Sequence, residues 1–142
     1  MSYEQLKLEN QLCFPLYAAS RAITRAYKPL LDPLGLTYPQ YLTLMSLWEH
    51  GDQSVSELGA CLMLDSGTLT PLLKKLEVKG LIVRQRDTQD ERRVVAKLTQ
   101  RGRALEQQAA EIPAKMGESI PMSTAEVAKL RAMLQQMLSD LG

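Results

Sequence analysis

The order of helix and strand signals in the middle of the chain constrains its fold more than any other feature. Ser54 and Glu57 have the spacing of a capping box, which satisfies two free backbone N–H groups at a helix start, so a short helix is predicted to about Met63. Asp65 predicts the start of a second helix, over Ser66 to about Lys79, and Gly80 predicts its end.

A charged hairpin is predicted directly after these two helices. Residues 81–86 and 94–98 alternate between apolar and polar side chains, as half-buried strands do. The segment between them begins with Asp87-Thr88-Gln89-Asp90, which has the composition of a turn. Two short helices followed by such a hairpin form a winged helix-turn-helix, so the predicted fold class is mainly α with a small β-wing.

Helices are also predicted on the N-terminal side of this core. From about Leu6 to Lys28, apolar residues recur every three or four positions, which indicates one long helix. Pro15 interrupts it, and either a helix that starts just before Pro15 or a kink there satisfies the pattern. A loop is expected from Pro29 through Gly35, after which Thr37 caps a helix to about Trp48. Pro39 falls in its first turn, where a missing N–H costs little.

The C-terminal part of the chain predicts further helices. A long helix is expected after Thr99 and Gly102, and Pro113 is expected to break or kink it. A second capping box at Ser123 and Glu126 opens a last helix.

Composition and charge limit the functions that this fold serves. The chain has 142 residues, 45% of them apolar, so one domain is expected. The formal charge is only +1, but the stretch from Arg84 to Arg103 holds seven basic and three acidic residues. Such a local basic patch suits a confined phosphate-binding surface, although a solvated charged hairpin has the same counts.

Several classes of protein are disfavoured. No run of about 18 apolar residues is present and the first residues lack a signal-peptide layout, so no membrane contact and a cytoplasmic location are expected. Cys13 and Cys61 are far apart and His50 is the single histidine, so no metal and no cofactor are expected. Cys61 follows Leu58 by one turn and is predicted to lie in the core.

The predicted winged helix-turn-helix suits DNA reading. The second helix fits the major groove, and the hairpin presents an arginine to the minor groove, where the potential is most negative. Small hydroxyl residues at the front of that helix, Ser66 and Thr68, allow close approach to phosphates and bases, although they also serve as ordinary helix caps.

A family resemblance supports this interpretation. The segment DERRVVAKLT (residues 90–99) resembles the wing motif of the MarR family of bacterial regulators, and the order of elements is similar as well. The segments LENQLCF, DPLGLTYPQY and LDSGTLTPLLKKLE (residues 8–14, 32–41 and 64–77) resemble the organic-hydroperoxide-sensing, OhrR-type members of that family. The resemblance covers roughly residues 5 to 140.

The resemblance implies a single MarR-type domain that forms a homodimer. The DNA-binding lobe would span about residues 38–100, with dimerisation helices at about 5–36 and 101–142, and two lobes would read a pseudo-palindromic operator on double-stranded DNA. It places Ser66, Thr68 and Thr70 on the groove-facing side of the second helix. It places Arg84, Asp90 and Arg92 in or beside the wing, where the Asp90 carboxylate would orient the Arg92 guanidinium towards the minor groove.

The resemblance also implies a thiol switch at Cys13. A thiolate, and not a thiol, attacks a peroxide, so the sensor must stabilise the anion. In similar proteins tyrosine hydroxyls from the partner subunit bind the reactive sulfur, and the matching residues are Tyr27 and Tyr38, while Tyr17 lies one turn from Cys13. Apolar neighbours such as Phe14 and Leu16 favour organic hydroperoxides over hydrogen peroxide.

The predicted outcome of oxidation is release of DNA by a repressor. No cysteine lies in the C-terminal helices, so the sulfenic acid is expected to form a mixed disulfide with a small cellular thiol or to be over-oxidised. The chain is predicted not to be an enzyme. Two alternatives stay open: a MarR-type regulator released by a small aromatic ligand, and a thiol peroxidase.

Overall fold

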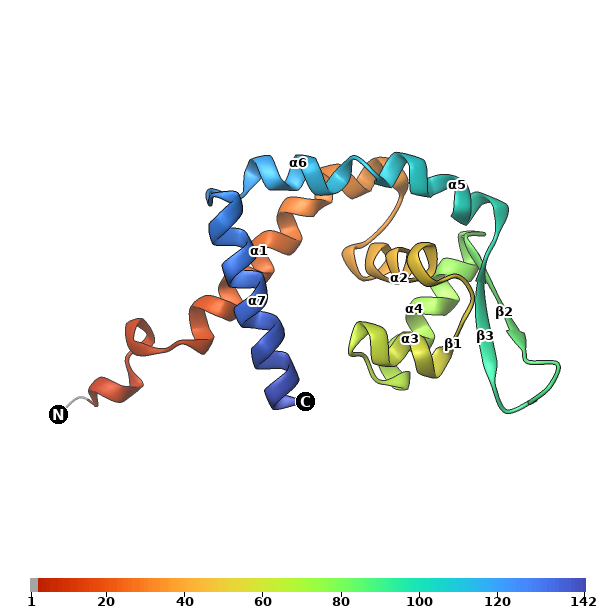
Figure 1. Cartoon of the computed structure of the whole chain (residues 1–142), viewed down its shortest axis with the longest axis horizontal. Helices are drawn as coiled ribbons and strands as arrows, with labels where there is room; N and C mark the ends of the chain where they lie inside the picture. Colours follow the sequence, from red (N-terminus) through yellow and green to blue (C-terminus); the bar gives the residue numbers. More distant parts are fainter. Residues whose placement is uncertain (1–2) are drawn as a thin grey trace. The chain divides into compact units, whose positions relative to one another are not determined.

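A computed structural model describes residues 3–142 (Figure 1). The chain divides into two compact units, one ending at Ile112 and one formed by Pro113–Gly142. The first unit carries the helix-turn-helix, the wing and the long N-terminal helix. The predicted lobe at 38–100 and its flanking dimerisation helices stay a prediction.

The first unit begins with two 3₁₀ turns, Glu4–Leu6 (η1) and Leu8–Asn10 (η2), and helix α1 then spans Cys13–Leu31. The helix expected from Leu6 therefore starts later, and it starts just before Pro15, the first of the two alternatives. Pro15 falls in the first turn, where its missing N–H needs no partner. Upstream, the Asn10 side chain donates to the Glu4 carbonyl at 2.7 Å, which stabilises the non-helical backbone.

The loop expected at Pro29 is wrong, because α1 continues through this proline to Leu31. The Lys28 ammonium pairs with the Asp32 carboxylate at 3.2 Å and supports this last turn. A 3₁₀ turn, Asp32–Leu34 (η3), follows and ends at Gly35 with φ 69°.

Helix α2 spans Tyr38–His50 and begins at a capping box in which Thr37 and Gln40 each satisfy the backbone N–H of the other. The cap at Thr37 and the place of Pro39 in the first turn are confirmed, and the helix ends two residues after the predicted Trp48. The Trp48 indole donates to the Gly102 carbonyl at 2.9 Å, which holds α2 against the start of α5.

The lobe follows the predicted order, with the helices α3 (Val55–Leu62) and α4 (Ser66–Val78) and then the strands β2 (Ile82–Arg86) and β3 (Val94–Leu98). The caps at Ser54 and Asp65 are confirmed. A short strand β1 (Gln53–Ser54), which the sequence did not predict, pairs with β3, so the sheet is antiparallel in the order β1-β3-β2. The centre of the lobe is a layer of fully buried aliphatic side chains: Leu44, Leu58, Leu69, Leu73, Leu76 and Ile82.

Helices α5 (Gln100–Ala109), α6 (Ile112–Ser119) and α7 (Thr124–Leu141) complete the chain. The long helix expected after Thr99 is broken and not kinked, since Pro113 occupies the second position of a new helix. The capping box of Ser123 and Glu126 at the start of α7 is confirmed. Within residues 3–142, no helix combines the length and the apolar character that a membrane crossing requires.

Candidate nucleic-acid interface and thiol site

Helix α4 presents an exposed face whose first turn is fixed by Asp65. The Asp65 carboxylate accepts a hydrogen bond from the Thr68 backbone N–H at 2.7 Å, and this bond holds the pKa of the carboxyl below its usual value. A negative charge at this end of a helix is favourable, because the free N–H groups there carry partial positive charge. The Thr68 side chain also bonds the Asp65 carboxylate, whereas the Ser66 and Thr70 hydroxyls have no role in starting the helix.

These three hydroxyl residues do not form one row. Ser66 and Thr70 are four residues apart and line the same open cleft of about 930 Å³, which the wing borders with Arg84 and Arg92. Thr68 lies two residues after Ser66, about 200° around the helix, and so it occupies the opposite edge of the exposed face. The structure brings Ser66 and Thr70 together and separates Thr68 from them.

Pro71 lies on the exposed face between these edges. Helix α4 begins at Ser66 and stays continuous through Pro71. With Gly67 one turn earlier, Pro71 gives the middle of this face little bulk. A surface of small side chains allows a helix to approach base edges closely.

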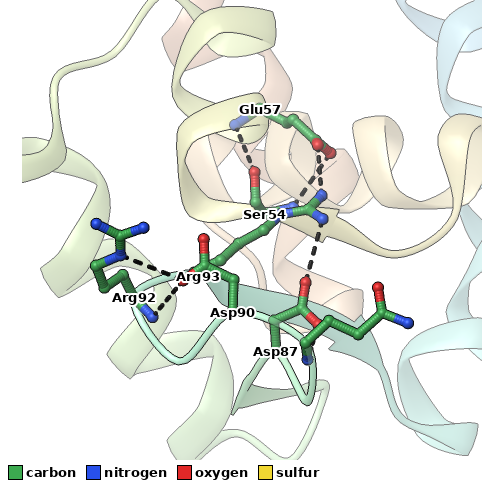
Figure 2. Close-up of polar contacts among 7 residues, drawn as sticks. Ser54, Glu57, Asp87, Asp90, Arg92 and Arg93 are labelled. Atoms are coloured by element: carbon green, nitrogen blue, oxygen red, sulfur yellow. Dashed lines mark hydrogen bonds and ion pairs between the residues drawn. The ribbon is translucent and has the colours of Figure 1, made fainter.

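The wing loop holds Arg92 outward. The Asp90 carboxylate accepts from the Arg92 backbone N–H at 3.1 Å and from its Nε at 3.4 Å, so the expected contact between these two side chains is present (Figure 2). The Arg92 side chain is nevertheless 92% exposed. Asp90 therefore fixes the base of the arginine while the guanidinium is open to a ligand.

Arg93 ties the wing to α3, a contact that the sequence analysis missed. Its Nη2 lies 2.6 Å from Glu57 Oε1 and its Nη1 lies 3.2 Å from Asp87 Oδ2 (Figure 2). Glu57 also accepts from the Ser54 backbone N–H through its other oxygen, as part of the capping box. The helix cap and the wing anchor therefore share one carboxylate, and the sequence pattern revealed only the cap.

Arg84, expected at the DNA, is already bound within the chain. Its Nε and Nη2 donate to Glu77 Oε1 at 3.2 and 3.0 Å, and its backbone N–H donates to Glu77 Oε2 at 3.1 Å. The backbone bond, followed by the guanidinium, lowers the pKa of the Glu77 carboxyl. Arg84 thus positions the wing against α4 at the edge of the cleft.

The tyrosines of the expected thiol site form a cluster. The rings of Tyr27 and Tyr38 have their centroids 4.7 Å apart, and Tyr41, which the sequence analysis did not single out, lies 5.8 Å from Tyr27 and 6.3 Å from Tyr38. Burial raises the pKa of both Tyr27 and Tyr38 above the usual value of 10.0. Both therefore remain neutral phenols at physiological pH and keep a proton to donate.

Cys13 lies at the other end of α1. It is the first residue of the helix and is exposed. Tyr17, one turn later, is also exposed, with the Arg21 guanidinium 5.4 Å from its ring centroid. Tyr27 follows Cys13 by 14 residues in the same helix, which at 1.5 Å per residue is about 21 Å. The tyrosine pair of one chain therefore cannot reach the cysteine of that chain.

The surface around Cys13 is apolar and open. Leu12 is 71% exposed, and Phe14 and Leu16 are 46% and 39% exposed. Exposed apolar side chains concentrated at one end of a helix in this way indicate an interaction site.

The predicted core position of Cys61 is wrong, because this thiol is exposed. Leu58 is the fully buried residue of α3, and Cys61, three residues later, lies at the edge of the buried stripe. Its sulfur is 3.2 Å from the Ser46 hydroxyl, which also bonds Gln53 Oε1 at 2.9 Å. Among residues 3–142, no group of three or more acidic, histidine or cysteine side chains could hold a metal ion.

Known proteins that are similar in sequence to this chain include several transcriptional regulators. The family model for the transcriptional regulator SarA/Rot matches residues 25–109. The organic hydroperoxide resistance transcriptional regulator of Bacillus subtilis is 48% identical over 139 residues, 98% of this chain and 95% of that protein. The regulator SarZ of Staphylococcus aureus is 38% identical over 98% of this chain and 94% of its own length.

Solved structures agree with the fold. Reduced AbfR bound to DNA matches with a TM-score of 0.81 and 36% identity, over 98% of both chains. Overoxidized AbfR bound to DNA matches with a TM-score of 0.80 and 37% identity over the full length of both chains. AbfR of Staphylococcus epidermidis itself matches with a TM-score of 0.75 and 36% identity, over 97% of this chain and 95% of that one. The winged helix-turn-helix predicted from the sequence is thereby confirmed.

Proposed function

This chain belongs to the MarR-type transcriptional regulators, in the organic hydroperoxide group, and from that premise we propose that it is a repressor that releases its operator when an organic hydroperoxide oxidises Cys13. The protein is a DNA-binding regulator and not an enzyme.

The DNA half of the proposal rests on α4 and the wing. Helix α4 enters the major groove with its exposed face against the DNA, so that Ser66 and Thr70 contact the DNA from one edge of this face and Thr68 from the other edge. Arg92 enters the neighbouring minor groove. The Asp90 contact and the 92% exposure of Arg92 support this role, since a pre-oriented arginine loses less entropy on binding. Arg84 supports it by fixing the angle of the wing through Glu77.

The sensor half of the proposal rests on Cys13. Its thiolate attacks the terminal oxygen of the hydroperoxide, an S–O bond forms while the O–O bond breaks, and the sulfur gives two electrons to the peroxide. The alkoxide that leaves takes a proton from water and becomes an alcohol, and Cys13 becomes a sulfenic acid. A small cellular thiol then displaces water from the sulfenic acid to give a mixed disulfide, or further peroxide over-oxidises it.

The separation of about 21 Å between Cys13 and Tyr27 carries the proposal that the sensor is completed by a second copy of the chain. Tyr27 and Tyr38 of the partner subunit donate phenol hydrogen bonds to the Cys13 thiolate, and their raised pKa values keep both protonated. Tyr17 lies beside the thiol on the same helix. The exposed Phe14 and Leu16 supply apolar surface that favours alkyl peroxides.

Operator binding, measured by fluorescence anisotropy at fixed salt, tests the proposal. Reduced wild type, wild type treated with cumene hydroperoxide and a small thiol, and Cys13→Ser treated in the same way are compared. The proposal predicts that the reduced and Cys13→Ser proteins bind tightly and that only the oxidised wild type dissociates. Equal release of both proteins, or of neither, contradicts it and favours a small aromatic effector; catalytic peroxide turnover without operator binding favours a peroxidase.

A further inference from the structure

Lys79 connects the tyrosine region to the end of the recognition helix. It is the C-cap residue of α4, and its backbone N–H donates to the Lys75 carbonyl at 3.1 Å. Its ammonium reaches a distant part of the chain, where it donates to the Gly35 carbonyl and, at 2.6 Å, to Gln40 Oε1. One side chain thus joins α4 to the turn that starts α2.

The turn that Lys79 contacts is the one that carries Tyr38. Gln40 is 2% exposed, and its Oε1 also accepts from the Thr37 backbone N–H in the capping box. Tyr38 is the first residue of α2, between these two capping residues. If Tyr38 is displaced, its neighbours Thr37 and Gln40 shift with it. Gln40 Oε1, which binds Lys79, therefore changes position as well.

This turn has a defined backbone conformation at its start and free space beside it. Gly35 has φ 69°, a left-handed conformation that fixes where its carbonyl points. A cavity of about 330 Å³ is lined by Thr37, Tyr38 and Pro39 together with Thr24 and Lys28 of α1. The side chain of Tyr38 thus has room to move, and the reciprocal bonds between Thr37 and Gln40 connect such a movement to the rest of the turn.

We propose that Lys79 is a positioning residue that transmits the state of the tyrosine pair to the recognition helix through its bonds to Gly35 and Gln40. The inference rests on the proposed thiol switch. When Cys13 of the partner subunit is oxidised, Tyr38 loses the thiolate as acceptor and moves, the 35–40 turn shifts, and Lys79 pulls the end of α4 away from its DNA-competent position.

The first test compares Lys79→Met with Lys75→Met, which removes the same charge from the same helix. The measured quantity is the ratio of operator affinities before and after oxidation. We expect Lys75→Met to keep the wild-type ratio, whereas Lys79→Met reduces it about tenfold, within the range of allosteric couplings. The rate of Cys13 sulfenic acid formation, followed by mass spectrometry of a trapped adduct, should be unchanged. An unchanged affinity ratio in Lys79→Met overturns the proposal.

A conservative variant separates transmission from folding. Lys79→Arg keeps hydrogen-bond donors for Gly35 O and Gln40 Oε1, so it should restore the wild-type ratio of operator affinities. A general loss of stability would not predict this restoration. If thermal melting shows that Lys79→Met is unfolded at the assay temperature, Lys79→Gln replaces it, with the same expected loss of coupling.

The second test needs no oxidant and so separates this inference from the proposed function. In reduced protein, Tyr38→Ala is combined with Lys79→Met and, as control, with Lys75→Met, and operator affinity is measured for each. We expect the effect of Tyr38→Ala to shrink by about fivefold in the Lys79→Met background only. Additive effects overturn the proposal. Coupling in this cycle without release of oxidised wild type would support the role of Lys79 and contradict the thiol switch.

Discussion

The lobe built from α3, α4 and the wing differs from the sensor end of α1 in where its side chains find their partners. In the lobe, Glu57 pairs with Arg93 and Glu77 pairs with Arg84 inside one chain. At the sensor end, Cys13 lies about 21 Å from Tyr27 and is surrounded by exposed apolar side chains. The lobe finds its partners within a single chain, whereas the proposed sensor requires a second copy.

DNA binding and the response to oxidation are therefore expected to depend on different parts of the molecule. Substitutions in the lobe should change how tightly the reduced protein holds DNA. Substitutions at the sensor should change how fast, and whether, oxidation ends that binding. A residue such as Lys79, which joins the lobe to the turn that carries Tyr38, should change mainly the link between the two quantities.

The largest effect is expected at Arg92. Arg92→Ala should weaken operator binding by more than about tenfold, because it removes the exposed guanidinium that Asp90 orients. Lys97→Ala is the charge-matched control, since Lys97 lies beside Asp52, at 4.0 Å, and does not line the cleft that Arg92 borders. Equal losses for both variants in anisotropy titrations would show that only net charge matters.

A smaller effect is expected at the tyrosine pair. The double variant Tyr27→Phe/Tyr38→Phe should slow Cys13 oxidation about tenfold, because the thiolate loses two phenol donors, while reduced operator binding changes little. Tyr41→Phe keeps a ring in the same cluster and should oxidise at nearly the wild-type rate. Stopped-flow measurement of sulfenic acid formation checks both; an unchanged rate in the double variant would remove the tyrosines from the sensor.

The ion pairs by which Arg93 anchors the wing should have a smaller effect on operator affinity. Arg93→Ala removes partly exposed ion pairs to Glu57 and Asp87, so operator affinity should fall only about threefold. Glu57→Gln keeps the helix cap and loses the charge, and it should give a similar loss if the ion pair is responsible. No loss in Glu57→Gln would attribute the Arg93 effect to the Asp87 contact.

The smallest effect concerns pH. Hydrogen bonds from Arg84 lower the pKa of Glu77 in the folded protein, so its contribution to stability is present above the usual value of 4.5 and is lost as the pH falls through the folded value. The Tm of Glu77→Gln should be about 1–2 °C below wild type at pH 7, a small difference because the pair is partly exposed. Melting curves should show this difference shrinking below about pH 4.5; a constant difference would contradict it.

The local signals in the sequence predicted the lobe well. Caps at Thr37, Ser54, Asp65 and Ser123 involve residues three apart, so the spacing alone reveals them. The strand β1 was not predicted, because two residues are too few to show a periodicity. It forms by pairing with the free edge of β3. Pro29 was taken as the start of a loop, whereas α1 continues through it to Leu31.

The candidate sites were only partly predictable, because sequence patterns reveal contacts between neighbouring residues and not contacts between distant ones. The contact between Asp90 and Arg92 joins residues two positions apart, and it was predicted. The pairs Glu57–Arg93 and Lys79–Gln40 join residues 36 and 39 positions apart, and no pattern in a single sequence marks them. Arg84 was placed at the DNA, but the chain also supplies Glu77 as its partner. The assignments of Cys13, Tyr17, Tyr27 and Tyr38 to a sensor stay predictions.

Subunit mixing tests most directly whether the sensor is completed by a second copy. Cys13→Ser chains, which keep their tyrosines, are mixed and refolded with Tyr27→Phe/Tyr38→Phe chains, which keep their cysteine, and the purified heterodimer is oxidised. If the tyrosines act across the interface, the one remaining Cys13 faces an intact pair and should react at the wild-type rate. If Cys13 in the heterodimer reacts as slowly as in the double-tyrosine homodimer, the tyrosines do not act from the partner and the account of the sensor is wrong.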